Sequence, residues 1–226
     1  MARDTLPRLR SAGLRLFSEQ WYDAVSVAEI CRRAGVSNGA FYRYFPGKQE
    51  LFFGLLEDFL ATLECDLAGV TGDSHRERLR SFVQVVAGAA RRYAAEVNVF
   101  REGQYRFPQF EERIRGLYVK TAQDIYGRPI SEVEYIYLLS GLRFVATRSL
   151  LSGLEGDEEL VVELLSGGVF EATDEAITLS TPPEPPAPGG ESPHDRLLHE
   201  AVALIGERGF YAVQVVDIAR PAGYSV

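Results

Sequence analysis

The sequence predicts an all-α protein, and three observations favour this fold class. Apolar residues recur every three or four positions over most of the chain. Serines that can cap a helix precede several of these runs, and no run of alternating residues is framed by hairpin turns. With 226 residues, 46% of them hydrophobic and 25% charged, the chain can bury a core and has an ordinary globular composition.

Three short helices are predicted at the N-terminus. The first spans residues 4–20, where Leu9 and Leu16 belong to an apolar stripe. The second follows Ser26, an N-cap with Glu29 three residues later as in a capping box, and is interrupted by Gly35. The third is capped by Ser37 and runs to Phe45, before a Pro-Gly pair.

Longer helices are predicted in the middle of the chain. Leu51, Leu55, Phe59 and Leu63 repeat every four residues, which indicates a long amphipathic helix. Ser131 and Glu134 form a second capping box, and Asp157 can cap the last helix of this region. The expected spans after residue 74 are 75–96, 110–126, 131–151 and 157–170.

A proline-rich segment divides the chain. Residues 181–193 read TPPEPPAPGGESP, a composition that predicts an extended linker. The expected organisation is a helix-turn-helix DNA-binding domain, a helical effector-binding and dimerisation domain, the linker, and an incomplete second helix-turn-helix-like segment. These parts span residues 1–50, 51–180, 181–193 and 194–226.

The last segment repeats the first. Shifted by 188 positions, residues 196–226 align without gaps onto residues 8–38, with 12 of 31 positions identical. Pro221 replaces Arg33 and is expected to remove a helical hydrogen bond and to disfavour helical geometry at Arg220. We expect this copy not to read DNA. It could begin a second unit, be a decayed copy, or pack on the body.

Charge is unevenly distributed. The net charge is −8, yet residues 1–50 hold eight Lys and Arg against five Asp and Glu. The remaining residues hold sixteen against twenty-seven. The N-terminal part is therefore the plausible contact for phosphate.

The two cysteines indicate neither a metal site nor a disulfide framework, and no cofactor is expected. Cys31 and Cys65 lie thirty-four positions apart, and Cys31 falls in an apolar helical pattern. The charged N-terminus contains no long apolar stretch, so we expect a cytoplasmic protein that does not enter a membrane.

The segments VAEICRRAG and SNGAFYRYF, joined by a tight glycine turn, are typical of a helix-turn-helix. Phe41 and Phe45 share one face and should pack inward. Asn38, on the outer side, could pair with adenine, and Arg43 with guanine or phosphate. The small Gly39 and Ala40 would permit close approach to the groove, and the hydroxyls of Tyr42 and Tyr44 suit phosphate contacts. Lys48 follows at a helix N-terminus, which also favours an anion.

The run LRLFSEQWYDAVSVAEICRRAGVSNGAFYRYFPGKQELF resembles the DNA-binding region of regulators of the tetracycline-repressor (TetR) family. Trp21 stands where that family more often has glycine, a change expected to affect packing only. The resemblance implies that the residues meeting bases or phosphates are Ser26, Ser37, Asn38, Gly39, Ala40, Tyr42, Tyr44 and Lys48, to which the groove-facing pattern adds Arg43.

The resemblance also implies a pocket for an unidentified small-molecule effector and a homodimer formed by the last two long helices. The stripe of Tyr135, Leu138, Leu142 and Val145 suits such a dimer and an intramolecular core equally well. Aromatic residues with interspersed arginines could line a pocket. The candidates are Tyr93, Phe100, Arg101, Tyr105, Tyr118, Arg143 and Phe144.

Two other classes of function compete. Residues 35–39 satisfy G-x-S-x-G, the nucleophile elbow of serine hydrolases, with Ser37 as the nucleophile. That motif needs a preceding strand, whereas a capped helix is predicted here, so no enzyme is expected. A TetR-like protein-interaction module without DNA binding is the other alternative. The favoured hypothesis is a homodimeric transcriptional repressor that reads a pseudo-palindromic operator in double-stranded DNA and is released by an effector.

Overall fold

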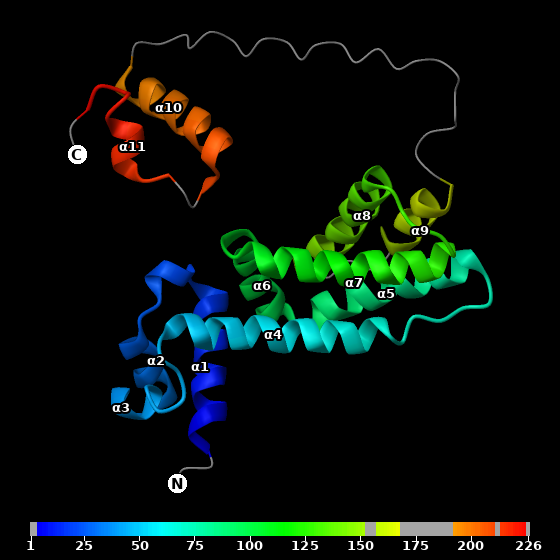
Figure 1. Ribbon diagram of the computed structural model, residues 1–226, viewed down its shortest axis with the longest axis horizontal. Helices are drawn as coiled ribbons and strands as arrows, with labels where there is room; N and C mark the ends of the chain where they lie inside the picture. The colour runs from blue at the N-terminus through cyan, green and yellow to red at the C-terminus, as the bar shows by residue number, and fades with distance from the viewer. Residues whose placement is uncertain (1–3, 152–156, 168–191, 211–212, 225–226) are drawn as a thin grey trace. The chain divides into compact units, whose positions relative to one another are not determined.

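A computed structural model describes residues 4–151, 157–167, 192–210 and 213–224, and every regular element in these ranges is helical (Figure 1). The all-α prediction is thus confirmed. The chain divides into two compact units, Met1–Glu171 and Ala172–Val226, which are described separately.

The first unit holds the predicted N-terminal helices and a larger helical body. Its elements are α1 (Thr5–Glu19), the 3-10 turn η2 (Tyr22–Ala24), α2 (Val27–Ala34), α3 (Asn38–Phe41), α4 (Lys48–Leu67), α5 (His75–Arg92), α6 (Ala94–Arg106), α7 (Pro108–Tyr126), α8 (Glu132–Leu151) and α9 (Asp157–Gly167). The part of the last predicted helix over 168–170 lies outside the described residues.

Serine caps begin the short helices as the sequence predicts. The Ser26 Oγ accepts from the Glu29 N–H at 3.2 Å, and the Ser37 Oγ accepts from the Ala40 N–H at 3.2 Å. Helix α3 is shorter than expected, because it ends at Phe41 and a turn follows. The Phe45 N–H still donates to the Phe41 carbonyl at 3.0 Å, so the segment keeps helical hydrogen bonding to its end.

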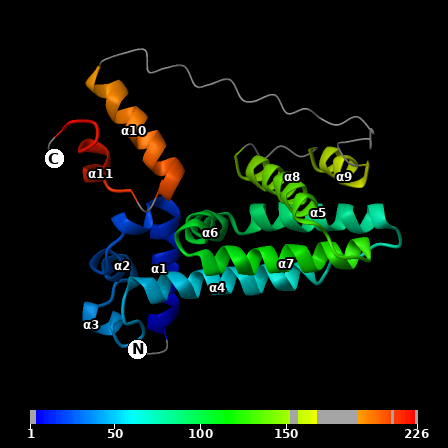
Figure 2. The same ribbon diagram turned by 45° about the horizontal axis from the view of Figure 1, so that its top comes forward.

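A continuous apolar core joins the N-terminal helices to the body. The predicted stripe of α4 is buried throughout its length, and α1 packs on both α4 and α6. The expected domain boundary at residue 50 therefore falls inside α4. This helix runs from the N-terminal helices along α5 and α7, while α8 and α9 pack on α5 (Figures 1 and 2).

One predicted helix is two in the structure. Residues 75–96 were expected to form a single helix, but α5 ends at Arg92 and α6 begins at Ala94. Tyr93 lies between them with φ −119° and ψ 42°. Neither glycine nor proline marks this break in the sequence, so only packing reveals it. Its consequence is that α6 turns to contact α1.

The stripe on α8 is an intramolecular core. Tyr135, Leu138, Leu142 and Val145 are each no more than 3% exposed, packed within the first unit. Other apolar residues of α8 and α9 are exposed instead: Val133, Ile136, Phe144, Leu160 and Leu164. No helix among the described residues is long and apolar enough to span a bilayer.

The second unit reproduces the start of the first. It contains α10 (Pro193–Arg208) and α11 (Val215–Ala219). Pro193, expected in the linker, is instead the first residue of α10 and follows the N-cap Ser192, while residues 181–191 lie outside the described ranges. The turn after α11 repeats the turn after α2, since the Gly223 N–H donates to the Arg220 carbonyl as that of Gly35 does to Arg32.

Pro221 shortens the second copy. Helix α11 ends at Ala219, three residues before Ala222, which is the equivalent of Ala34 at the end of α2. Helical geometry persists at Arg220, with φ −62° and ψ −53°, so the expectation for that residue was wrong. The steric preference against helix before proline is moderate, and the Arg220 N–H still donates to the Val216 carbonyl at 3.2 Å.

Candidate nucleic-acid interface

Two phenylalanines fix the orientation of α3. Phe41 is fully buried and Phe45 is 8% exposed, and their ring centroids lie 5.5 Å apart in the apolar core. Val36, in the turn before α3, packs against the same core. Because these side chains occupy one face, the opposite face of the segment must point outward.

The outward face carries the polar residues expected to meet DNA. Asn38 and Arg43 are exposed, and Tyr42 and Tyr44 are 58% and 38% exposed. A Cβ added at Gly39 would meet nothing within 4 Å, so this position lies open. This arrangement, with a supported helix and a free polar face, is what a major groove admits.

Three of the residues expected to contact DNA have structural roles. The hydroxyls of Ser26 and Ser37 lie at the surface and cap α2 and α3. Ala40, expected beside the groove, is 7% exposed and faces the interior. Its assignment as a contact residue is therefore corrected. Helix α3 has only four residues, and Ala40 falls on the same buried side as Phe41.

Lys48 turns its ammonium inward. Its Nζ donates to the carbonyls of Tyr22 at 2.7 Å and Val25 at 2.9 Å, and lies 4.3 Å from the centroid of the Tyr22 ring. Burial lowers the pKa of Lys48. This differs from the expected phosphate contact by the side chain. The backbone N–H of Lys48, at the first turn of α4, remains suited to an anion.

A charged cluster that the sequence did not reveal surrounds Tyr22. The Glu102 carboxylate of α6 is 7% exposed and accepts from the Tyr22 N–H at 3.0 and 3.1 Å. The Arg106 guanidinium lies over the Tyr22 ring, 4.8 Å from its centroid, and forms an ion pair with Asp23. Burial raises the pKa of Glu102. The body of the protein is thus bonded directly to the segment before α2.

Within the part of the chain that the structure describes, the predicted effector residues are divided between the core and the surface. Phe100 and Tyr118 are buried in the core, against Phe59 and Phe82 respectively. The others are at or near the surface, with Arg143 lying 5.9 Å from the ring centroid of Tyr105. These surface candidates are Tyr93, Arg101, Tyr105, Arg143 and Phe144.

A different pocket lies between α4, α5 and α7. Its volume is about 430 Å³, within the range of small-molecule sites. Its apolar wall includes Leu67, Leu117 and Ile125. Arg78 and Lys120 supply positive charge at its lining, which also contains Glu64 and Asp124.

The hydrolase hypothesis is wrong. The residues before Ser37 form α2 and a left-handed turn at Gly35, with φ 64°, instead of a strand. The Ser37 Oγ caps α3. His75, the only histidine described in the first unit, bonds the Ile125 carbonyl at 3.3 Å and contacts the Tyr126 ring, away from this turn.

A comparison with known protein families finds a match over the same N-terminal helices. Residues 9–55 match the family described as bacterial regulatory proteins, tetR family. This span covers α1 to the start of α4 and includes the complete outward face of α3.

Several curated proteins are similar in sequence. The nucleoid occlusion factor SlmA of Haemophilus influenzae is 30% identical over 122 residues, covering 48% of this chain and 55% of that protein. The HTH-type transcriptional regulator BetI of Rhizobium meliloti is 31% identical over 137 residues, covering 60% and 63%. The HTH-type transcriptional repressor BdcR of Escherichia coli is 36% identical over 84 residues, covering 37% and 42%. The match to SlmA thus spans about half the length of that relative.

Solved structures share the fold. A TetR-like transcriptional regulator from Rhodococcus sp. RHA1 superposes with a TM-score of 0.56 at 23% identity, covering 73% of this chain and 94% of that one. The fatty acid degradation regulator FadR from Bacillus halodurans gives 0.56 at 16% identity, covering 73% and 100%. Residues 9–55 are therefore a DNA-binding domain of the tetR family of bacterial regulatory proteins, carried on the helical fold of TetR-like regulators.

Proposed function

We propose that this protein is a DNA-binding transcriptional repressor, and that α3 enters the major groove of its operator. One observation carries the proposal: Phe41 and Phe45 are buried while Asn38, Tyr42 and Arg43 are exposed on the other face. Asn38 has the donor and acceptor needed to read adenine, and Arg43 can reach guanine or phosphate. Acting on DNA would place the protein in the cytoplasm.

A homodimer would bring two such helices to successive major grooves, about 34–36 Å apart, and so read a pseudo-palindrome. The exposed apolar residues of α8 and α9 support this assembly. Val133 is 76% and Ile136 55% exposed on α8, and Leu160 is 52% exposed on α9. Apolar residues on two adjacent helices suit burial against the same helices of a second subunit.

An effector would relieve binding by preferring a dimer with a different separation of its two α3 helices. The pocket of about 430 Å³ between α4, α5 and α7 is a candidate site. Helix α4 lines this pocket and continues to the DNA-binding domain, so a ligand there could alter the position of α3.

Sequence selection on random duplexes tests the proposal. The full chain should enrich a pseudo-palindrome, and Tyr42→Ala should weaken binding to all sites alike. Asn38→Ala should also relax the preference at one position in each half-site, by about 1–3 kcal/mol of discrimination. Equal binding by both variants and the unaltered chain, or no enrichment at all, would leave the protein-interaction alternative.

A further inference from the structure

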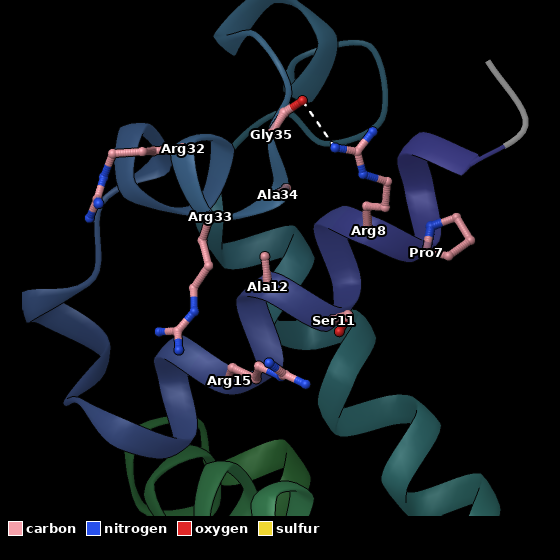
Figure 3. Close-up of a pocket in the computed structure, with 9 residues that line it drawn as sticks. All are labelled: Pro7, Arg8, Ser11, Ala12, Arg15, Arg32, Arg33, Ala34 and Gly35. Carbon is pink, nitrogen blue, oxygen red and sulfur yellow. Dashed lines mark hydrogen bonds between the residues drawn. The ribbon is translucent and has the colours of Figure 1, made fainter. Parts of the chain in front are cut away.

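An arginine-lined cleft opens between α1 and α2, beside the turn that leads into α3 (Figure 3). Its volume is about 490 Å³, and the buried alanines Ala12 and Ala34 lie at its base. The remaining lining residues are Pro7, Arg8, Ser11, Arg15, Arg32, Arg33 and Gly35. We call this site the arginine cleft.

The charges in the cleft are only partly neutralised. Arg33 pairs with Glu19 at 2.8 Å, and Arg32 approaches Glu29 at 3.7 Å with its side chain 78% exposed. Among the described residues, no hydrogen bond or ion pair engages the exposed Arg15 guanidinium. Figure 3 shows the Arg32 guanidinium directed away from the other lining residues. The guanidinium groups of Arg8, Arg15 and Arg33 against the Glu19 carboxylate leave an excess of positive charge at a concave surface, which favours an anion.

The position of the cleft favours phosphate of DNA over other anions. Arg8 donates to the Gly35 carbonyl at 3.1 Å, so one wall of the cleft is the turn that immediately precedes α3. Figure 3 shows the Arg15 and Arg33 guanidinium groups farther from that turn, with Arg15 on α1 and Arg33 extending from α2. A duplex held by α3 would therefore bring backbone phosphates toward the cleft, and guanidinium groups match phosphate geometry.

The internal repeat supplies a comparison within the same chain. The second unit keeps Arg196 and Arg220, the equivalents of Arg8 and Arg32. It has Ala203 in place of Arg15, Pro221 in place of Arg33 and Glu200 in place of Ala12. The copy therefore loses two positive charges and gains a negative one at the equivalent surface. The arginine excess accompanies the unit that carries α3, as a DNA contact requires.

We infer that the arginine cleft binds a backbone phosphate of the duplex outside the base pairs that α3 reads. This contact rests on the proposed DNA binding and extends it, because it adds affinity without sequence preference. Arg15 makes the direct contact, and Glu19 competes with phosphate for Arg33.

Salt titration of full-chain binding tests the inference on two duplexes. One duplex is the selected operator alone, and the other carries ten further base pairs on each side. Arg15→Gln should reduce the slope of log K against log salt by about 0.9 per DNA-binding domain, hence about 2 for a dimer. The reduction should occur only on the longer duplex.

Glu19→Gln should change the affinity for the longer duplex in the opposite direction to Arg15→Gln. Removing the competing carboxylate should tighten binding to the longer duplex, whereas a merely structural disturbance would weaken it. Arg113→Gln, an equal loss of charge at an exposed position on α7, is the matched control and should change neither slope.

Unchanged binding of the longer duplex by Arg15→Gln, or an equal reduction on both duplexes, would overturn the inference while leaving the proposed function intact. Failure of the unaltered chain to bind either duplex would overturn both.

Discussion

The Lys48 ammonium lies against Tyr22, donating to its backbone carbonyl at 2.7 Å while its Nζ is 4.3 Å from the ring centroid. The second bond, to the Val25 carbonyl at 2.9 Å, joins the first turn of α4 to the segment before α2. Lys48 therefore holds the DNA-binding helices against the body, in addition to any contact its N–H makes with DNA.

Lys48→Met should lower the free energy of unfolding by about 2 kcal/mol, because two carbonyls lose a charged donor. DNA binding should fall with it. Chemical denaturation measures the first effect and duplex titration the second. Arg113→Met removes an exposed cation of α7 and serves as the control. If Lys48→Met reduces DNA affinity but leaves stability unchanged, its side chain acts at phosphate and the structural role is refuted.

Gly39→Ala should separate DNA contact from folding. The position is helical and open, so alanine should stabilise the fold by up to about 1 kcal/mol. The added methyl should nevertheless weaken operator binding, because it stands between α3 and the groove floor. Thermal unfolding and duplex titration of the same variant provide both readouts. Unaltered affinity would mean that α3 does not approach DNA through Gly39.

Gly35→Ala provides the contrasting glycine variant. Gly35 has φ +64°, and a Cβ there would lie 2.6 Å from the Arg8 guanidinium. Left-handed geometry costs other residues about 1–2 kcal/mol, so this variant should be destabilised by at least that amount. Thermal unfolding checks the loss, and a stability equal to that of the unaltered chain would contradict the turn geometry.

Glu102→Gln should change how stability depends on pH. Burial raises the pKa of Glu102 above its usual 4.5, so the folded state binds this proton more tightly than the unfolded chain does. That contribution to stability is present at low pH and is lost as the pH rises through the raised pKa. Glutamine keeps an acceptor for the Tyr22 N–H but does not ionise.

The glutamine variant should therefore gain stability relative to the unaltered chain as the pH rises from 4.5 to 7. Denaturant unfolding at several pH values measures the difference. Glu112→Gln, at an exposed position on α7, should show no such trend. A relative loss of stability for Glu102→Gln over this interval would show that the ionised carboxylate is the favoured form.

Ile136→Lys should disrupt the proposed dimer. Ile136 is 55% exposed within one chain, so lysine should be tolerated in the monomer but costly in a helix-helix interface. The dimer dissociation constant should rise about tenfold or more, equivalent to about 1.4 kcal/mol. Sedimentation equilibrium measures it, with Trp21→Lys as a control at an exposed residue of the DNA-binding domain. Identical dissociation constants would place the interface elsewhere.

Local sequence patterns were sufficient to predict much of the DNA-binding domain. The caps at Ser26 and Ser37 and the turn at Gly35 each depend on residues within four positions of one another. The same is true of the inward pair Phe41 and Phe45. Trp21, expected to alter packing, is 64% exposed and leaves these features unaffected.

Sequence patterns did not predict the features that depend on packing between distant segments of the chain. The break at Tyr93 carries no glycine or proline, and periodicity alone could not tell that Phe100 and Tyr118 join the core instead of a ligand pocket. A helical stripe has the same spacing whichever neighbour covers it. The buried stripe of α8 and its exposed apolar residues likewise required the structure to distinguish them.

The sequence by itself determined that α3 forms, which of its faces is polar, and that the last segment repeats the first. Tertiary structure alone decided that Glu102 meets Tyr22 across 80 positions, that the Lys48 ammonium turns inward, and that Arg15 and Arg33 line one cleft. The physical reason is the distance along the sequence over which each kind of interaction acts. Capping and periodicity act within about one helical turn, whereas these contacts depend on how separate helices pack.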